Sequence, residues 1–97
     1  MELKRGEWKI IRVDGTEATV QSKPTLQAVY EAIGCENIDT VTLDHKNQVV
    51  MMVDDVGMID GKPVNKKATA LMKEAFGRGY PNAIHGDVAI VNDEDFA

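Results

Sequence analysis

Residues 38–53, IDTVTLDHKNQVVMMV, hold the pattern that decides the fold. In the first half, the apolar residues Val41 and Leu43 alternate with threonines, which is typical of a strand with one face in water. The segment 48–53 is apolar on both faces and also predicts a strand. The polar residues 44–47 between the two segments predict a turn, so together they form a hairpin.

A second hairpin and a helix are predicted before this segment. Residues 7–13, EWKIIRV, are β-branched and aromatic, and the dipeptide DG at 14–15 is a strong hairpin signal before the next strand, at 16–22. The apolar residues of the segment 26–33 recur at the spacing i, i+3, i+4 and i+7, which predicts an amphipathic helix. Gly34 follows as a typical helix terminator.

The segment 57–77, GMIDGKPVNKKATALMKEAFG, predicts a loop and then a second helix. The helical stripe consists of Ala68, Leu71, Met72 and Ala75. Gly77 is expected to end this helix. Residues 87–91, DVAIV, predict a last strand, and residues 93–97 an acidic tail.

The element order is therefore ββαββαβ, in a single domain of residues 1–97 with its core at about 7–92. This order predicts an α+β fold with a mainly antiparallel sheet. Helices about 10 Å wide can cover about four strands spaced about 4.8 Å apart, so we expect both helices on one face. The apolar strands at 49–53 and 88–91 then need cover on the other face, which predicts a homodimer or a complex with another protein.

Composition narrows the classes of function. The net charge of −5 argues against direct binding to nucleic acids, which requires a basic surface. The single cysteine, Cys35, cannot form a disulfide within the chain and fits a reducing compartment. The longest apolar run, 49–53, is too short to span a membrane, and the N-terminus lacks the apolar segment of a signal peptide. We expect a cytoplasmic protein that does not contact a membrane.

Few residues could perform catalysis. The only serine, Ser22, lies at a helix entry, where capping explains it. Cys35 and the two histidines, His45 and His85, stand in no recognised catalytic context. The carboxylates match neither the spacing of a calcium loop nor, with a single nearby histidine, the ligand count of a zinc site. The sequence predicts no enzyme, no cofactor and no metal site.

The start of the second helix is the candidate for an anion-binding site. Asn65 is predicted to cap the helix, and two lysines follow it at the positive end of the helix dipole, where cations are disfavoured. A bound anion would compensate for them. The candidate site consists of Lys62, Asn65, Lys66 and Lys67, with Arg78, Tyr80 and His85 approaching from the loops. Solvated lysines without a ligand explain the same pattern, so both interpretations stay open.

Several short motifs suggest a family. They are TLQAVYEAIG at 25–34, IDTV at 38–41, GKPVN at 61–65 and IHGDVAIV at 84–91. With these motifs the chain resembles a small family of unknown function found mostly in bacteriophage, prophage and plasmid genomes. The family usually has G-G-x-I-E where this chain has GCENID at 34–39, so we expect a different connection there. The resemblance implies a mobile-element origin and a host cytoplasm, and it implies no reaction.

Three hypotheses of function follow. The first is a non-enzymatic accessory protein, encoded by a phage or another mobile element, that binds a host or defence component. The second is a dimer that binds a small phosphorylated ligand, such as a nucleotide signal, at the anion site. The third is a DNA mimic that occupies a nucleic-acid-binding protein, although the acidic residues at 93–97 and the net charge of −5 give a low charge density for that role.

Overall fold

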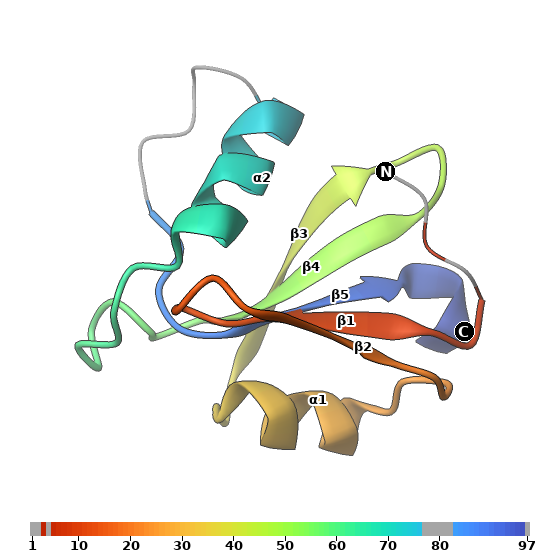
Figure 1. The fold of residues 1–97 in the computed structure, drawn as a ribbon, viewed down its shortest axis with the longest axis horizontal. Coiled ribbons are helices and arrows are strands. Elements are labelled where there is room, and N and C mark those ends of the chain that lie inside the picture. The colour runs from red at the N-terminus through yellow and green to blue at the C-terminus, as the bar shows by residue number, and fades with distance from the viewer. Residues whose placement is uncertain (1–2, 4, 77–82, 97) are drawn as a thin grey trace.

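The computed structural model describes residues 3, 5–76 and 83–96 of the chain, and these form one antiparallel sheet with two helices (Figure 1). The strands are β1 (Trp8–Ile11), β2 (Glu17–Val20), β3 (Ile38–Asp44), β4 (Val49–Asp54) and β5 (Val88–Asn92). The helices are α1 (Leu26–Ile33) and α2 (Lys66–Phe76), and a short 3-10 helix, η2 (Asp93–Phe96), follows β5. The predicted α+β class and the ββαββαβ order are confirmed.

The strand order β2-β1-β5-β4-β3 places the last strand in the middle of the sheet. Both predicted hairpins are present, β1 with β2 and β3 with β4. β5 lies between them and pairs antiparallel with β1 on one side and with β4 on the other. β5, the last strand along the chain, therefore joins the two hairpins into one sheet.

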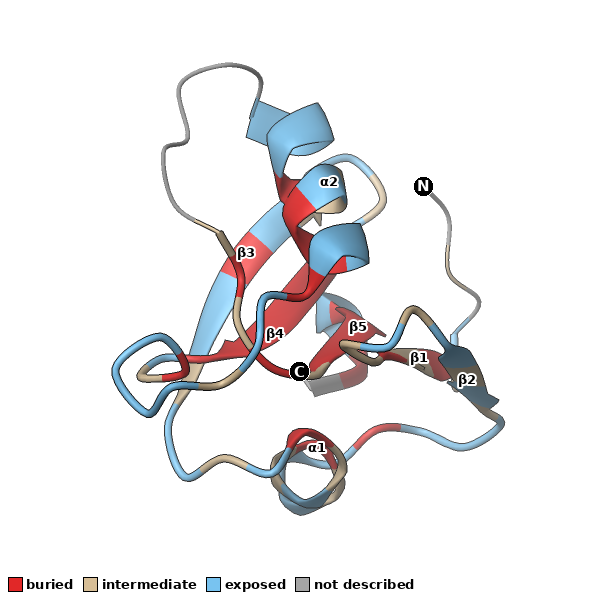
Figure 2. Ribbon diagram, turned by 60° about the vertical axis from the view of Figure 1, so that its left-hand side comes forward, coloured by how far each residue is buried: buried red, intermediate tan, exposed pale blue. Residues whose placement is uncertain are grey.

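The helices lie on opposite faces of the sheet, so the prediction that both cover one face is wrong (Figures 1 and 2). Alternate residues of β4 belong to two different cores. Val50 and Met52 pack with α1, whereas Met51 and Val53 pack with α2. The connections explain this arrangement, because α1 joins the edge strands β2 and β3 across one face, and α2 joins the neighbours β4 and β5 across the other.

This arrangement removes the reason for a partner on an uncovered sheet face. Every residue of β4 and β5 is buried, because these inner strands have a helix on each side. The apolar pattern that suggested a missing partner is satisfied within the chain. The homodimer was inferred from that pattern. It stays a prediction, and the covered sheet gives no reason for it.

The acidic segment after β5 is tied to the start of the chain. The Asp95 carboxylate is buried and accepts hydrogen bonds from Arg5 Nε at 2.7 Å and from the Gly6 N–H at 3.2 Å. Arg5 Nη1 also pairs with Glu94 at 2.7 Å. Burial by itself would raise the pKa of Asp95, but the bonds from Arg5 and Gly6 outweigh it and hold the pKa below its usual value.

This contact predicts a specific acid sensitivity. A carboxyl whose pKa is lowered by folding stabilises the protein fully above its unfolded-state pKa of about 4, and this contribution is lost as the pH falls through the folded-state pKa. We expect Asp95→Asn to lower the free energy of unfolding by about 1 kcal/mol at pH 7 and to show a smaller further loss below about pH 4 than the wild type. Denaturant titrations across this pH range measure both effects. Parallel losses in the two proteins would contradict the role of Asp95.

Candidate functional site

Asn65 holds the start of α2 from a fully buried position. Its Oδ1 accepts a hydrogen bond from the Ala68 N–H at 3.0 Å, which confirms the predicted helix cap. Its Nδ2 donates to the carbonyls of Ile11, at 2.9 Å, and of Gly86, at 3.0 Å. One side chain therefore fixes the helix start, the end of β1 and the segment before β5 relative to one another.

The lysines of the candidate anion site are directed to different partners. Lys67 Nζ pairs with Glu17 on β2 at 2.9 Å. Lys62 Nζ pairs with the buried Asp54 carboxylate and donates to the Gly34 carbonyl at 2.8 Å. Lys66 is exposed, and its ammonium group has no hydrogen bond or ion pair with a described residue.

The remaining members of that set do not complete a site. The imidazole Nδ1 of His85 donates to the Lys62 carbonyl at 2.8 Å, so this histidine supports the main chain before α2. Arg78 and Tyr80 lie outside the described residues, as does Gly77, which was expected to end α2. The acidic partners of the lysines were not predicted from sequence. Glu17 lies 50 positions before Lys67, and no local pattern pairs Lys62 with Asp54, although Asp54 is close along the chain.

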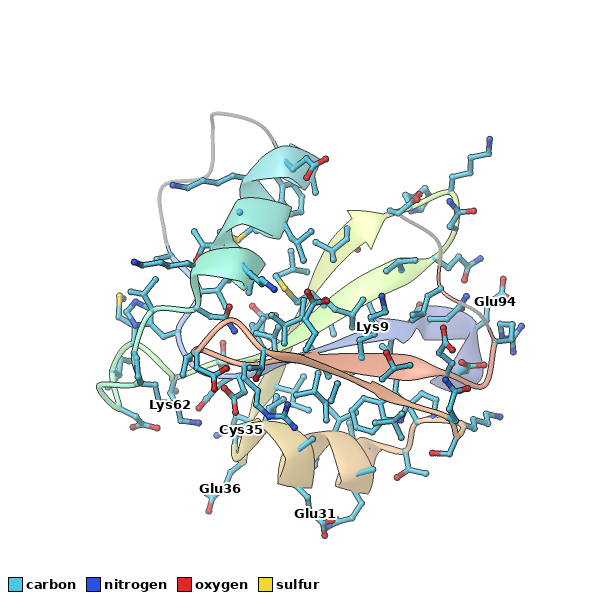
Figure 3. The ribbon with its side chains drawn as sticks, in the orientation of Figure 1. Lys9, Glu31, Cys35, Glu36, Lys62 and Glu94 are labelled. Atoms are coloured by element: carbon cyan, nitrogen blue, oxygen red, sulfur yellow. The ribbon has the colours of Figure 1, made fainter. Side chains whose placement is uncertain are left out.

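Cys35 has the electrostatic surroundings of an unreactive thiol. It is free and partly buried, and Lys62 lies at the same end of the molecule (Figure 3). Burial and the nearby Asp54 carboxylate raise the pKa of the thiol, and the opposite influence of Lys62 is smaller. Because a nucleophilic cysteine needs a lowered pKa, this position does not favour covalent catalysis.

Within the described part of the chain, no group of three or more His, Cys, Asp and Glu side chains is placed to hold a metal ion. None of the described helices has the length and apolar character needed to cross a bilayer.

The loop between β4 and α2 presents two apolar side chains to water. We call residues 55–64 the tip loop. At its outer end Met58 is 62% exposed and Ile59 is 82% exposed. Asp55 and Asp60 flank them, are also exposed, and form no ion pair with a described residue. The tip loop therefore combines an apolar end with two carboxylates.

The main chain of the tip loop is fixed by its own hydrogen bonds. At the start of the loop, Asp54 accepts two of them, from the Val56 N–H at its Oδ1 and from the Gly57 N–H at its carbonyl. Three more bonds lie within the loop, from Asp60 N–H to the Val56 carbonyl, from Gly61 N–H to the Met58 carbonyl and from Lys62 N–H to the Gly57 carbonyl. Gly57 also packs directly on the chain before β5, since a Cβ added there would lie 2.8 Å from the His85 carbonyl oxygen. The exposed apolar side chains therefore project from a defined backbone.

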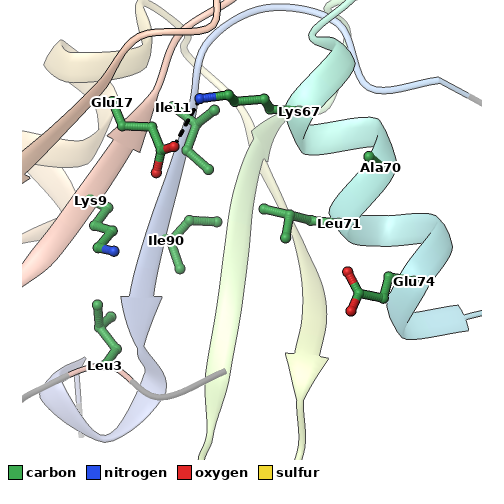
Figure 4. Close-up of a pocket in the computed structure, with 9 residues that line it drawn as sticks. All are labelled: Leu3, Lys9, Ile11, Glu17, Lys67, Ala70, Leu71, Glu74 and Ile90. Atoms are coloured by element: carbon green, nitrogen blue, oxygen red, sulfur yellow. Dashed lines mark hydrogen bonds and ion pairs between the residues drawn. The ribbon is translucent and has the colours of Figure 1, made fainter.

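A groove of about 290 Å³ lies between α2 and β1 (Figure 4). Its helical wall is formed by Lys67, Ala70, Leu71 and Glu74, which share one face of α2 because they follow the spacing i, i+3, i+4 and i+7. Its other wall is formed by Lys9 and Ile11 of β1, with Glu17 of β2. Ile90 of β5 lies at the base, and Leu3 from the start of the chain also lines the groove. The groove was not predicted from sequence, because the helical pattern assigned Leu71 to the buried stripe.

Comparison with known proteins places the chain in a family. The model of a family described as a domain of unknown function (DUF3846) matches residues 8–97. No curated protein and no solved structure matches the chain. The matched region begins with β1 and contains both the tip loop and the two walls of the groove. The chain therefore belongs to the DUF3846 family of domains of unknown function.

Proposed function

We propose that the protein is a non-enzymatic binding protein that contacts another protein through the tip loop. The exposure of Met58 and Ile59 on a hydrogen-bonded main chain carries this proposal. Single exposed apolar residues are common, whereas adjacent large apolar side chains that are exposed together are more typical of a protein interaction site. A backbone that is already ordered loses little conformational entropy on binding, so more of the contact energy remains as affinity.

The resemblance to proteins of mobile elements suggests which kind of partner to seek. A phage- or plasmid-encoded binding protein would act in the host cytoplasm on a host component, including components of host defence. The nucleotide-binding hypothesis has less support, because Lys62 and Lys67 already pair with carboxylates and Asn65 already caps α2. The DNA-mimic hypothesis also has less support, because Arg5 offsets part of the acid after β5.

The experiment is affinity capture from host lysate with three baits. The wild type is compared with the double variant Met58→Ser/Ile59→Ser and with the control Leu26→Ser. Leu26 is also an exposed apolar residue, at 48%, but it lies on α1. We expect the wild type and the control to retain a stoichiometric partner that the double variant loses by about tenfold or more.

Stability separates a binding defect from a folding defect. Because the replaced side chains are exposed, the double variant should unfold within about 0.5 kcal/mol of the wild type. A partner that binds the double variant as well as the wild type would contradict the proposal. The same conclusion would follow from a captured nucleotide without a protein.

A further inference from the structure

The groove beside α2 supports a second binding surface, separate from the tip loop. We propose that this groove receives an amphipathic α-helix of a partner protein, which lies next to α2 in the same layer. The shape of the groove, the free space on this face of the sheet, the absence of free backbone groups at its base and the charges on its walls each support a helix.

The groove runs along α2. Lys67 and Glu74 stand seven residues apart on one face of the helix, so the helical wall extends for about 10 Å, or two turns. Between them, the small Ala70 is exposed and Leu71 is half-buried. A small residue between longer ones allows a second helix to approach closely, and neighbouring helices pack about 8–10 Å apart.

The sheet has room for a second helix on this face. Five strands spaced about 4.8 Å apart span about 19 Å, whereas one helix is about 10 Å wide. α2 packs mainly on β3 and stands toward that side of the sheet (Figure 2). The floor of the groove, Ile11 and Ile90, is already buried, so one more helix in this layer would lie on the rim between α2 and the β1–β2 hairpin, where Lys9 and Glu17 stand.

The backbone around the groove favours a helix over an extended peptide. β1 pairs with β2 on one side and with β5 on the other, and β5 also pairs with β4. The strands at the base therefore have no edge to offer to an added strand. An extended peptide would bury unpaired N–H and C=O groups here, whereas a helix satisfies its own backbone internally.

The charges on the two walls specify the flanks of the partner helix. Lys9 stands on the β1 wall, where its charge helps to lower the pKa of Glu17 without forming an ion pair with it. Glu74 stands on the α2 wall and forms no hydrogen bond or ion pair with a residue in the described ranges. Lys67 is already paired with Glu17. The complementary helix has an apolar stripe toward Ala70 and Leu71, an acidic residue on the side of β1 and a basic residue on the side of α2.

The test uses a displayed library of peptides of about 18 residues with helix-favouring composition, selected against the intact protein. We expect the selected peptides to converge on an apolar stripe with acid on one flank and base on the other. Ala70→Arg places a long side chain in the groove from an exposed position, so its melting temperature should match that of the wild type. Its affinity for the selected peptides should fall by about tenfold or more.

A charge exchange distinguishes specific binding at this groove from nonspecific binding of the peptides. Lys9→Glu should weaken the selected peptides, and replacing their acidic flank residue with lysine should restore binding to that variant. The variant Met58→Ser/Ile59→Ser should bind the peptides like the wild type, because the tip loop lies outside the groove. Undiminished binding to Ala70→Arg, selection of proline-containing or strand-patterned peptides, or failure of the charge exchange would each overturn the proposal.

Discussion

Replacement of Asn65 with aspartate is expected to lower the free energy of unfolding by about 3–5 kcal/mol, although the two side chains have nearly the same shape. The Oδ1 bond to the Ala68 N–H can survive, because aspartate caps helices as well as asparagine does. The loss of stability comes from the Nδ2 atom, which aspartate lacks. This atom donates to the carbonyls of Ile11 and Gly86, and a carboxylate would place a buried negative charge against both oxygens.

Thr25 provides the matched control for this prediction. It caps α1 from an exposed position, where its hydroxyl oxygen accepts a hydrogen bond from the Ala28 N–H at 3.1 Å. Thr25→Asp should change stability by no more than about 0.5 kcal/mol, because both residues cap well and water solvates the new charge at this exposed position. Chemical denaturation of the two variants gives the comparison. If Asn65→Asp were as mild as Thr25→Asp, Asn65 would be only a cap.

The two caps show what local sequence can and cannot predict. Thr25 and Asn65 both precede a helical stripe, and Asn65 was predicted as a cap from that position, whereas the first helix entry offered both Ser22 and Thr25. The pattern could not distinguish an exposed cap from a fully buried one. The carbonyls that bind Asn65 come from residues 54 and 21 positions away, and sequence contains no local signal for such partners.

The same limit explains the misplaced helix and the missed groove. The apolar pattern of β4 correctly predicted two buried faces, but it could not say whether this chain or a partner covers them. On α2, Leu71 and Ala75 fit the predicted stripe as well as Met72 does. Of these three residues, only Met72 is fully buried, since Leu71 faces the groove and Ala75 is exposed. Helical periodicity identifies a face of a helix, whereas the position of the helix over the sheet decides which residues are covered.

The ion pair of Lys62 with Asp54 gives the second large expected effect. The side chain of Asp54 is 2% exposed, whereas that of Lys62 is 26% exposed. Lys62→Met therefore leaves a buried carboxylate without its cation, and we expect a loss of about 2–4 kcal/mol in the free energy of unfolding. Asp54→Asn should lose only about 1 kcal/mol, because the lysine can turn into water and the amide oxygen can still accept from the Val56 N–H.

A double-mutant cycle with binding as a second readout completes this prediction. Lys62→Met combined with Asp54→Asn should be more stable than Lys62→Met alone, because the second change removes the unpaired charge. Since Asp54 also fixes the main chain of the tip loop, Lys62→Met should weaken partner capture, and the double variant should recover part of it. Additive losses of stability would mean that the pair is not coupled. Full capture by Lys62→Met would mean that the tip loop binds its partner without the order that this ion pair provides.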